Sequence, residues 1–369
     1  MTTLPDVMTA AVLGPAGVIH ARELPVPELG SEDVLVQVRR ASLCGTDLKI
    51  RARKFFKGDG PPVDTFVPGH EYAGVVAAIG SAVDEFAVGD RVVTEAHRGC
   101  MRCSNCLHGK YTDCLNYGKQ HKGHRTQGMT VNGGFAEYAR NHVSTLHRLP
   151  DSLGFDAGVI LTTVGTVMHA FDVLNDLVVG ARVAVIGPGP IGLLAVQVAK
   201  QLGAESVALI GTRESRLKLG HTFGADLVLN ARDGDVVSRV REMGDGHGVD
   251  IVMECSGAPS AVDDALLMCK RAGRVVLVGF FEHPVTANLN EAVMNGINLY
   301  SVRGEGSGSL ARAVSLASQG RLETETLVTH HFPLEEVSEA FDTYAERRGD
   351  AIKVMLDISE DTPGHPSGS

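Results

Sequence analysis

The chain shows two patterns of hydrophobic and polar positions, and they predict two kinds of structure. Between Met8 and about Pro150, short apolar or alternating runs are separated by glycine, which is typical of a β-rich domain with long loops. After Gly180, strand-like apolar runs alternate with helical segments, and this alternation predicts a parallel sheet covered on both faces. The expected strands are 34–38, 74–80, 90–93, 182–186, 206–210, 227–229, 250–253 and 274–278, and the expected helices are 191–202, 214–223, 235–242 and 261–269.

Composition agrees with a folded chain that has more than one domain. Of the 369 residues, 44% are hydrophobic and 21% are charged, which supplies material for two cores and excludes a disordered or fibrous protein. The formal net charge of −10 argues against binding to a nucleic-acid backbone, so no nucleic-acid partner is expected.

The sequence predicts a cytoplasmic protein without a membrane span. The first residues lack a basic region followed by a long apolar stretch, so they do not resemble a signal peptide. The longest apolar zone, 178–199, is interrupted by Arg182 and by the Gly-Pro-Gly-Pro run at 187–190. It therefore reads as a strand, a turn and a helix.

A nucleotide-binding loop is predicted where the second region begins. The run Gly187-Pro188-Gly189-Pro190-Ile191-Gly192 is a G-x-G-x-x-G between a predicted strand and a predicted helix. The first glycine permits the tight turn, the second lets the backbone approach a pyrophosphate, and the third lets the helix pack on the strand. The free N–H groups at the helix start would bind the phosphates, although a plain tight turn is the alternative.

The end of the next strand bears on the choice between NAD and NADP. NAD enzymes usually carry an acidic residue here for the ribose 2′-hydroxyl, but this chain has Gly211, Thr212 and Arg213. A guanidinium suits a 2′-phosphate, and Arg216 could add a second charge. NADP is therefore preferred over NAD, with a solvated Arg213 and an NAD-tolerant site as the alternative.

Four of the seven cysteines fall within one short segment. Cys100, Cys103, Cys106 and Cys114 have the spacing C-x2-C-x2-C-x7-C. Four thiolates in a short loop can enclose a tetrahedral Zn²⁺, which would stabilise the loop and leave no open position for a substrate. An iron–sulfur cluster is the rival, but the proline typical after the last ferredoxin cysteine is absent.

Two more motifs join a metal-binding side chain to a nearby carboxylate. They are Cys44-Gly45-Thr46-Asp47 and Gly69-His70-Glu71. The segment 69–80, followed by Gly-Asp-Arg-Val at 89–92, resembles the signature of zinc-containing medium-chain alcohol dehydrogenases. The cysteine lobe and the nucleotide loop follow in that family's order and spacing. The resemblance covers roughly residues 8–358 and is closest to the polyol (sorbitol-like) and threonine dehydrogenase branch.

The resemblance implies an α/β protein with a GroES-like β-rich catalytic domain plus a doubly wound parallel Rossmann domain. The implied domains are 1–163 with 304–369, carrying both zinc sites, and 164–303, binding the dinucleotide. A catalytic zinc would be bound by Cys44 and His70, with Glu71 as a direct or switching ligand. Asp47 would hydrogen-bond the outer nitrogen of His70, and Thr46 would relay the hydroxyl proton.

Two positions depart from the family pattern. Thr162 occupies the place of the third protein ligand, and a neutral hydroxyl is a poor ligand for zinc. Lys49 stands where many relatives carry a relay histidine. It could steer a proton or an anionic substrate, or simply be solvated.

The remaining expectations concern the nicotinamide half and an exposed loop. Cys255 and Ser256, like Val278 and Gly279, follow predicted strands at the carboxyl edge of the sheet, where they would lie against the nicotinamide. The basic run 119–125 is expected to be an exposed loop.

The resulting prediction is a zinc-dependent oxidoreductase that transfers a hydride between a secondary alcohol or polyol and NADP, giving the ketone. One alternative is a zinc-independent reductase of the same fold acting on an activated double bond, for which Thr162 is the best argument. Another is a non-catalytic nucleotide-binding protein that keeps only the cysteine lobe. The family resemblance alone implies a homodimer or homotetramer.

Overall fold

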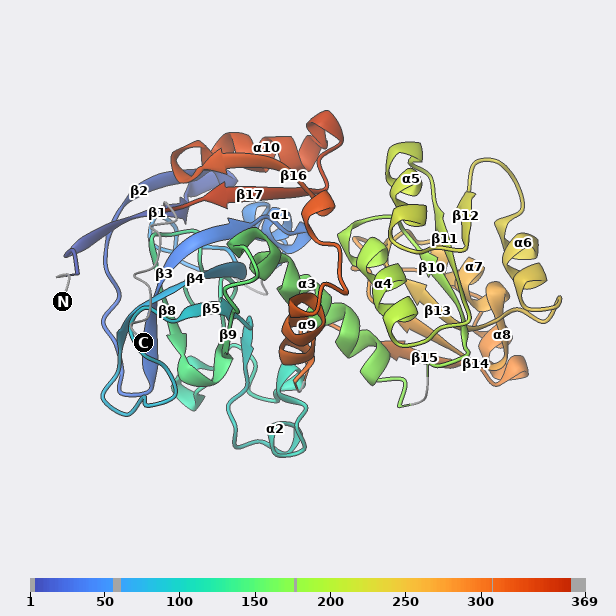
Figure 1. Ribbon diagram of the computed structural model, residues 1–369, viewed down its shortest axis with the longest axis horizontal. Coiled ribbons are helices and arrows are strands. Elements are labelled where there is room, and N and C mark those ends of the chain that lie inside the picture. Colours follow the sequence, from blue (N-terminus) through green and yellow to red (C-terminus); the bar gives the residue numbers. More distant parts are fainter. Residues whose placement is uncertain (1–3, 56–60, 176–177, 307, 360–369) are drawn as a thin grey trace. The chain divides into compact units, whose positions relative to one another are not determined.

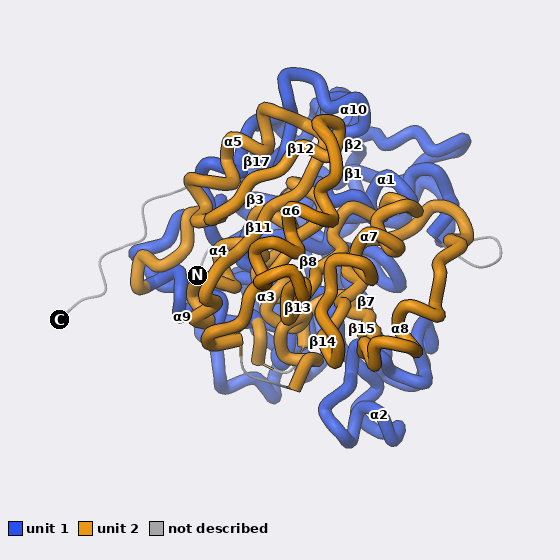
Figure 2. Tube along the Cα trace, turned by 90° about the vertical axis from the view of Figure 1, so that its right-hand side faces the viewer, with its two compact units in different colours: residues 1–162, 310–318, 324–369 blue, residues 163–309, 319–323 orange. Residues whose placement is uncertain are grey.

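A computed structural model describes residues 4–55, 61–175, 178–306 and 308–359. The chain forms two compact units, which are drawn in different colours in Figure 2. Unit 1 consists of residues 1–162, 310–318 and 324–369, and unit 2 of residues 163–309 and 319–323. No helix in these described ranges is long and apolar enough to cross a membrane.

Unit 2 is built on a six-stranded parallel sheet. The strands in spatial order are β12 (Leu227–Asn230), β11 (Ser206–Gly211), β10 (Arg182–Ile186), β13 (Val249–Glu254), β14 (Cys269–Leu277) and β15 (Asn298–Ser301). Helices α4 (Pro190–Gln201) and α5 (Glu214–Thr222) lie on one side of the sheet, and α6 (Val236–Met243), α7 (Ala261–Met268) and α8 (Leu289–Asn295) lie on the other (Figure 1).

The order of strands reverses between β10 and β13, which are hydrogen-bonded neighbours in the sheet. In doubly wound sheets the carboxyl ends of the strands at such a reversal border the dinucleotide site. The central strands are buried on both faces, as parallel strands covered by helices should be. The predicted doubly wound fold is confirmed. The sequence did not predict β15, whose four residues are largely exposed and carry no apolar alternation.

Unit 1 contains a seven-stranded sheet in which most neighbours are antiparallel. The spatial order is β16 (Val328–Pro333), β17 (Lys353–Asp357), β3 (Asp33–Ser42), β4 (Glu71–Ile79), β5 (Arg91–Thr94) and β9 (Leu146–Arg148), with β8 (Tyr138–His142) also on β3. Two strand pairs stand apart, β1 (Val7–Leu13) with β2 (Ile19–Pro25), and β6 (His97–Arg98) with β7 (Arg125–Thr126). The helices are α1 (Gly45–Arg51), α2 (Ser104–Leu107), α9 (Ser309–Ser318), α10 (Val337–Glu346) and the first part of α3 (Phe155–Asp172).

The antiparallel register of β3 and β4 positions the first candidate metal site. Ser42, the last residue of β3, lies opposite Glu71, the first residue of β4. Cys44 follows the end of β3 and His70 precedes β4, so the two residues are brought to the same edge of the sheet although 26 positions separate them in the sequence. The strand pairing alone therefore explains why these two motifs meet.

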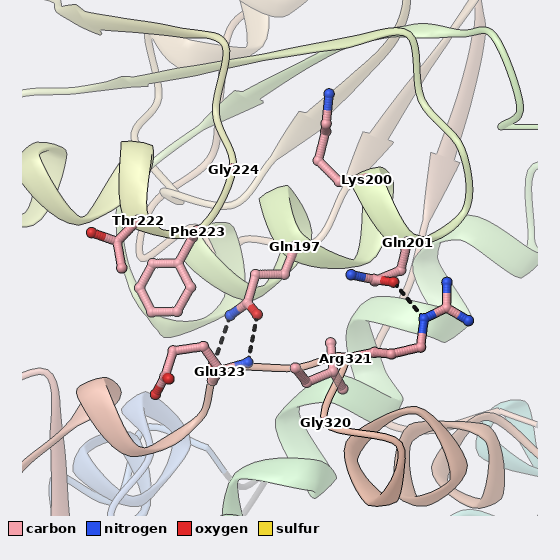
Figure 3. A pocket seen from close by; sticks show the side chains of 10 residues that line it. Gln197, Lys200, Gln201, Thr222, Phe223, Gly224, Gly320, Arg321 and Glu323 are labelled. Carbon is pink, nitrogen blue, oxygen red and sulfur yellow. Dashed lines mark hydrogen bonds between the residues drawn. The ribbon is translucent and has the colours of Figure 1, made fainter.

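Residues 319–323, from the C-terminal part of the chain, belong to unit 2 and are hydrogen-bonded to α4 (Figure 3). The Gln197 amide donates to the Glu323 carbonyl over 2.7 Å and accepts from the Glu323 N–H over 2.8 Å. Arg321 Nε donates to Gln201 Oε1 over 2.8 Å. Side chains of one helix thus hold this segment, and its residues 320–323 help to line an open pocket of about 340 Å³.

Candidate functional site

Three potential metal ligands gather where β3 ends and β4 begins. One ligand atom each of Cys44, His70 and Glu71 lies within 4.8 Å of the others. His70 and Glu71 are buried, whereas Cys44 is half-buried and its main chain begins α1. A thiolate, an imidazole and a carboxylate on converging backbones form a donor set that suits zinc.

Asp47 lies against the imidazole of His70, as the family resemblance implies. The distance from His70 Nδ1 to Asp47 Oδ1 is 3.5 Å, and the Asp47 side chain is fully buried. The other carboxylate oxygen, Oδ2, accepts a hydrogen bond from the Cys44 main-chain N–H over 2.8 Å. Asp47 therefore links both candidate ligands. A carboxylate on Nδ1 leaves Nε2 as the nitrogen for a metal.

The electrostatics of this cluster favour positive charge. Burial alone would lower the pKa of His70, but the Asp47 carboxylate and the Cys44 side chain raise that pKa well above its usual range. A site whose anionic groups stabilise a proton on histidine would also stabilise a cation in its place. The residues present thus fit a bound Zn²⁺.

Glu71 is bound by two residues that the sequence did not single out. Its Oε2 accepts hydrogen bonds from the Ser42 hydroxyl and from the Lys353 ammonium group. Lys353 is 2% exposed and reaches Glu71 because β17 pairs with β3. Burial would raise the pKa of Glu71, but Lys353 and His70 outweigh this and lower it, so the carboxyl group stays ionised.

Three further residues that the sequence analysis discussed for this site, Thr46, Lys49 and Thr162, lie on helices α1 and α3. The Thr162 hydroxyl, which is buried in α3, donates to the Val159 carbonyl over 2.8 Å. Thr46 and Lys49 both lie on α1 and are half-buried.

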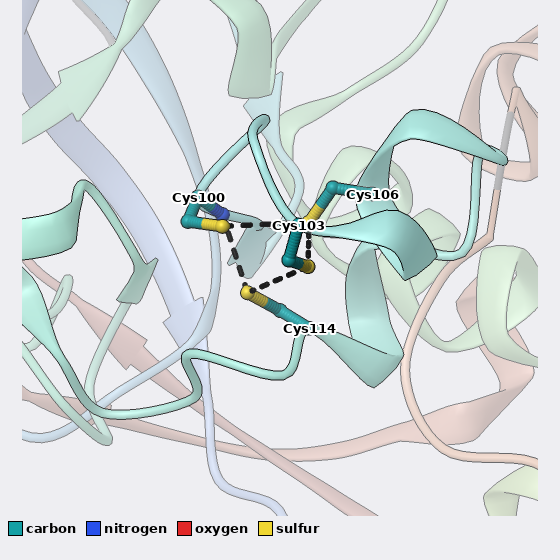
Figure 4. Close-up of side chains that lie close together, drawn as sticks. All are labelled: Cys100, Cys103, Cys106 and Cys114. Atoms are coloured by element: carbon teal, nitrogen blue, oxygen red, sulfur yellow. Dashed lines mark hydrogen bonds between the residues drawn. The ribbon is translucent and has the colours of Figure 1, made fainter.

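The four-cysteine segment forms a second cluster (Figure 4). The sulfur–sulfur distances are 4.0 Å between Cys100 and Cys106, 3.4 Å between Cys103 and Cys106, and 3.9 Å between Cys103 and Cys114. Four thiolates at about 2.3 Å from a tetrahedral zinc are about 3.8 Å apart. These three distances are close to that separation, and the sulfurs of all four cysteines lie within 4.8 Å of one another.

N–H groups donate to two of these sulfurs, and the four thiols differ in how readily they ionise. Cys114 Sγ accepts from the main-chain N–H groups of Cys100 and Asn116, each over 3.3 Å, and the Asn116 amide donates to Cys100 Sγ over 3.2 Å. Burial raises the pKa of Cys100, but the amide of Asn116 and the nearby main-chain donors outweigh it and lower the pKa to about 6. Burial and the Cys103 thiol raise the pKa of Cys106 to about 12. A cation would remove this imbalance, because it stabilises every thiolate at once.

The basic run 119–125 is exposed only in part, which corrects the sequence-based expectation. Residues 119–122 are exposed, but His124 is fully buried and its Nδ1 accepts from the Gly118 N–H over 3.1 Å. Arg125 forms an ion pair of 2.6 Å with Asp33, which is itself buried. The charge pattern failed as a guide here because the carboxylate that neutralises Arg125 lies 92 positions away in the sequence.

The glycine-rich loop connects β10 to α4 in the geometry of a phosphate-binding turn. Gly187 has φ +109°, which favours glycine, and a Cβ on Gly192 would lie 1.9 Å from the Gly187 carbonyl oxygen. At Gly189 an added Cβ would meet nothing within 4 Å. Only the middle glycine thus faces open space, at the N-terminus of α4, where a pyrophosphate would bind. Pro190 and Ile191 form the first turn of that helix.

Alanine substitutions should distinguish the glycine that leaves space for the phosphates, Gly189, from the glycine that packing requires, Gly192. Gly189→Ala should leave the thermal unfolding midpoint unchanged but weaken NADP binding at least about tenfold, because its φ of −84° suits alanine while the new methyl group occupies the phosphate space. Gly192→Ala should lower the unfolding midpoint, because its Cβ meets backbone. Calorimetric titration and thermal unfolding would test both variants. Unaltered NADP affinity in Gly189→Ala would mean that the pyrophosphate lies elsewhere.

Thr212 and Arg213 connect β11 to α5. Thr212 is exposed and Arg213 is half-buried, whereas Arg216 is 8% exposed within α5. Gly211 is required by packing, because an added Cβ would lie 2.4 Å from the ring of Pro188. Arg213 is therefore less buried than Arg216 and lies at the strand end that faces the ribose in related folds.

The loops after β13 and β14 meet the glycine-rich loop. A Cβ on Gly187 would lie 2.8 Å from Ser256, and a Cβ on Gly279 would lie 2.4 Å from the Gly257 N–H nitrogen. Cys255 extends this contact, since its N–H donates to the Ile186 carbonyl over 2.8 Å. Val278, which is buried, and Gly279 both donate their N–H groups to the Glu254 carbonyl. Cys255 and Ser256, which the sequence predicts for the nicotinamide half, thus lie next to the glycine-rich loop, and Val278 and Gly279 lie against the turn that carries them.

Comparison with known proteins agrees with this architecture. Residues 30–151 match the model of the alcohol dehydrogenase GroES-like domain, and residues 190–319 match that of the zinc-binding dehydrogenases. L-threonine 3-dehydrogenase of Bacillus subtilis is 36% identical over 341 residues, covering 90% of this chain and 93% of that protein. Sorbitol dehydrogenase of the same organism is 29% identical, with coverage of 96% and 98%.

Solved structures give the same result. A zinc-binding dehydrogenase of Sinorhizobium meliloti bound to NADP superposes with a TM-score of 0.86 at 28% identity, covering 96% of this chain and 100% of that one. An Escherichia coli oxidoreductase of unknown specificity has a TM-score of 0.89 at 27% identity, with the same coverage. The chain belongs to the zinc-containing medium-chain alcohol dehydrogenase family. It is therefore an oxidoreductase, and the family predicted from the sequence is confirmed.

Proposed function

We propose that this protein oxidises a secondary alcohol or polyol to the ketone, with NADP preferred as hydride acceptor, and also catalyses the reverse reduction. The observation that carries the proposal is the convergence of Cys44, His70 and Glu71 within 4.8 Å, supported by Asp47. Lys353 pairs with the buried Glu71 carboxylate and keeps it ionised beside the two other candidate ligands. The threonine and sorbitol dehydrogenases among its relatives carry names that imply secondary-alcohol substrates.

Cys44, His70 and Glu71 would hold Zn²⁺, which when bound acidifies the substrate hydroxyl. Asp47 orients the imidazole of His70. Lys353 and Ser42 hold the Glu71 carboxylate in place. Thr46, in the first turn of α1, accepts the hydroxyl proton and passes it toward solvent.

The reaction balances without any further reactant. The substrate carbon loses a hydride to the nicotinamide and the hydroxyl loses a proton, so the products are a ketone, the reduced cofactor and one proton. The glycine-rich loop with Gly189 holds the pyrophosphate, and the loops after β13 and β14 hold the nicotinamide half.

Metal content and turnover together test this proposal. Metal-replete protein should contain about two zinc ions per chain and should form reduced cofactor with L-threonine, sorbitol or another secondary alcohol. One zinc per chain, with reduction of activated double bonds instead, would replace the proposal by the zinc-independent reductase. Cofactor binding without turnover across the panel would favour a non-catalytic nucleotide-binding protein.

The preference for NADP depends on Arg213. Arg213→Asp should weaken NADP binding about 10- to 100-fold and leave NAD binding nearly unchanged or improved, because the charge-assisted contact to the 2′-phosphate is replaced by repulsion. Calorimetric dissociation constants for both cofactors would measure this. Arg239→Asp, an exposed substitution on α6, is the matched control and should alter neither constant. Equal losses for NAD and NADP in Arg213→Asp would contradict the preference.

We also propose that the chain forms a homo-oligomer through the β15 edge of unit 2. Leu289, Val293 and Met294 on α8 are 58%, 77% and 72% exposed, and β15 ends the sheet. An exposed edge strand with apolar neighbours can pair with its own copy about a two-fold axis.

Val293→Glu should convert the assembly to a smaller species by placing a charge in this apolar surface. Light scattering coupled to gel filtration would measure the mass. Val179→Glu changes an equally exposed apolar residue, 70% exposed and outside α8 and β15, and should leave the mass unchanged. Unaltered mass in Val293→Glu would place any interface elsewhere.

A further inference from the structure

A fully buried carboxylate lies beneath the loops that hold the nicotinamide half of the cofactor. Glu254, the last residue of β13, is 0% exposed. Its Oε1 accepts hydrogen bonds from the Ser256 N–H (2.7 Å), the Ser256 hydroxyl and the Gly257 N–H (2.9 Å). Its Oε2 is buried and has no hydrogen-bond partner in the described structure. One oxygen is therefore saturated, while the other lacks the partner that a buried charge ordinarily needs.

Glycines bring the backbone of two loops against this carboxylate. A Cβ on Gly279 would lie 2.5 Å from Glu254 Oε2, so Oε2 faces a residue that has no side chain to shield it. Ser256, which donates to Oε1, approaches Gly187 so closely that a Cβ there would lie 2.8 Å from it. Glu254 thus lies under the meeting point of the loops after β10, β13 and β14.

Nothing in the described part of the chain neutralises Glu254. No lysine, arginine or histidine of these ranges forms an ion pair with it, in contrast to the buried Glu71, which is paired with Lys353. Burial raises the pKa of Glu254 above its usual range, and the three donors on Oε1, which favour the ionised form, offset part of this rise. A buried carboxylate of this kind is stabilised by any positive charge that comes to the site.

The oxidised and reduced cofactors differ by such a charge. The nicotinamide ring carries a positive charge when oxidised and none when reduced. The nicotinamide half binds over the second half of the sheet, which begins with β13. We propose that Glu254 makes the site selective for the redox state of the cofactor, by favouring NADP⁺ over NADPH through its charge and without touching either. This inference rests on the proposed function, because it requires a bound nicotinamide.

The test compares the dissociation constants of the two redox states. Glu254→Gln keeps an oxygen that can accept from Ser256 and Gly257 but removes the charge. We expect it to raise the ratio of the NADP⁺ constant to the NADPH constant about tenfold, because the oxidised ring loses its attraction to one partly screened charge. Calorimetry would give both constants, and the fluorescence of NADPH, which NADP⁺ lacks, would give the NADPH constant independently.

Two controls separate a charge effect from a structural one. Glu242→Gln removes a charge from an exposed position on α6 and should leave the ratio unchanged. Glu254→Asp keeps the charge but shortens the side chain, so it should weaken both redox states together at a constant ratio. If Glu254→Gln does not fold, Glu254→Asp tests the proposal in its place. A tenfold shift of the ratio in Glu254→Asp, which keeps the charge, would overturn the proposal.

The failure of this inference differs from that of the proposed function. An unchanged ratio in Glu254→Gln, or an equal loss for both redox states, would show that Glu254 only holds the 255–257 turn. If wild-type protein binds neither NADP⁺ nor NADPH, the proposed function itself fails.

Discussion

Replacing Cys44 with serine should reduce alcohol-dependent formation of NADPH by at least about a thousandfold. A serine hydroxyl is a poor zinc ligand, so the donor set at the end of β3 would lose its thiolate. The local backbone should persist, because the contact of residue 44 with Asp47 uses the main-chain N–H. Initial rates at 340 nm and zinc per chain, which should fall by about one, would measure the effect.

Nucleotide binding provides the control for this variant. Cys44 lies in unit 1 and the glycine-rich loop lies in unit 2, so the dissociation constant for NADP should not change. Cys269→Ser, at a buried cysteine of β14 outside both clusters, makes the same chemical change and should keep full zinc content. Wild-type turnover in Cys44→Ser would exclude the metal-assisted mechanism.

The second large effect concerns stability. Cys103→Ser should lower the unfolding midpoint of unit 1 by about 6–12 °C, which corresponds to roughly 3 kcal/mol for a domain of this size. Removing one of four thiolates opens a closed site, and the free energy of metal binding that stabilises the loop is lost. Differential scanning calorimetry on zinc-loaded protein would measure the midpoint.

Chelation shows whether the metal or the thiol is responsible. Stripping zinc from the wild type should bring its midpoint close to that of Cys103→Ser, because both proteins then lack the bound ion. The cofactor dissociation constant should stay the same throughout. A gap between the two midpoints that survives chelation would mean that Cys103 stabilises the lobe by packing alone.

Unit 2 could be predicted from the sequence because many of its contacts join segments that are close together in the sequence. The strand 182–186 was expected from one apolar run, and β10 has those bounds. Each helix packs on strands adjacent to it in the sequence, so the alternation of patterns carries the topology. The glycines of the loop could be assigned roles for the same reason, since the contact between Gly187 and Gly192 spans five positions.

The partners of the candidate ligands could not be predicted in this way. Lys353 lies 282 positions from Glu71, and only the pairing of β17 with β3 brings them together. A lysine in an apolar run near the end of the chain resembles an ordinary strand residue that points to solvent. Glu254 likewise follows an apolar strand, and its burial depends on loops that fold over it from β10 and β14.

The position of β17 in the sheet also has a consequence for how the protein is made. Strand β3, which leads to Cys44, is synthesised early, but its neighbour β17 is among the last described residues to be made. Unit 2 is mostly one continuous stretch, so it can complete its sheet during translation. In unit 1, one edge of β3 lacks its neighbouring strand until β17 has been made. In a growing chain, Lys353 reaches Glu71 only after unit 2 has been made, so the Cys44–His70–Glu71 cluster is completed after the glycine-rich loop.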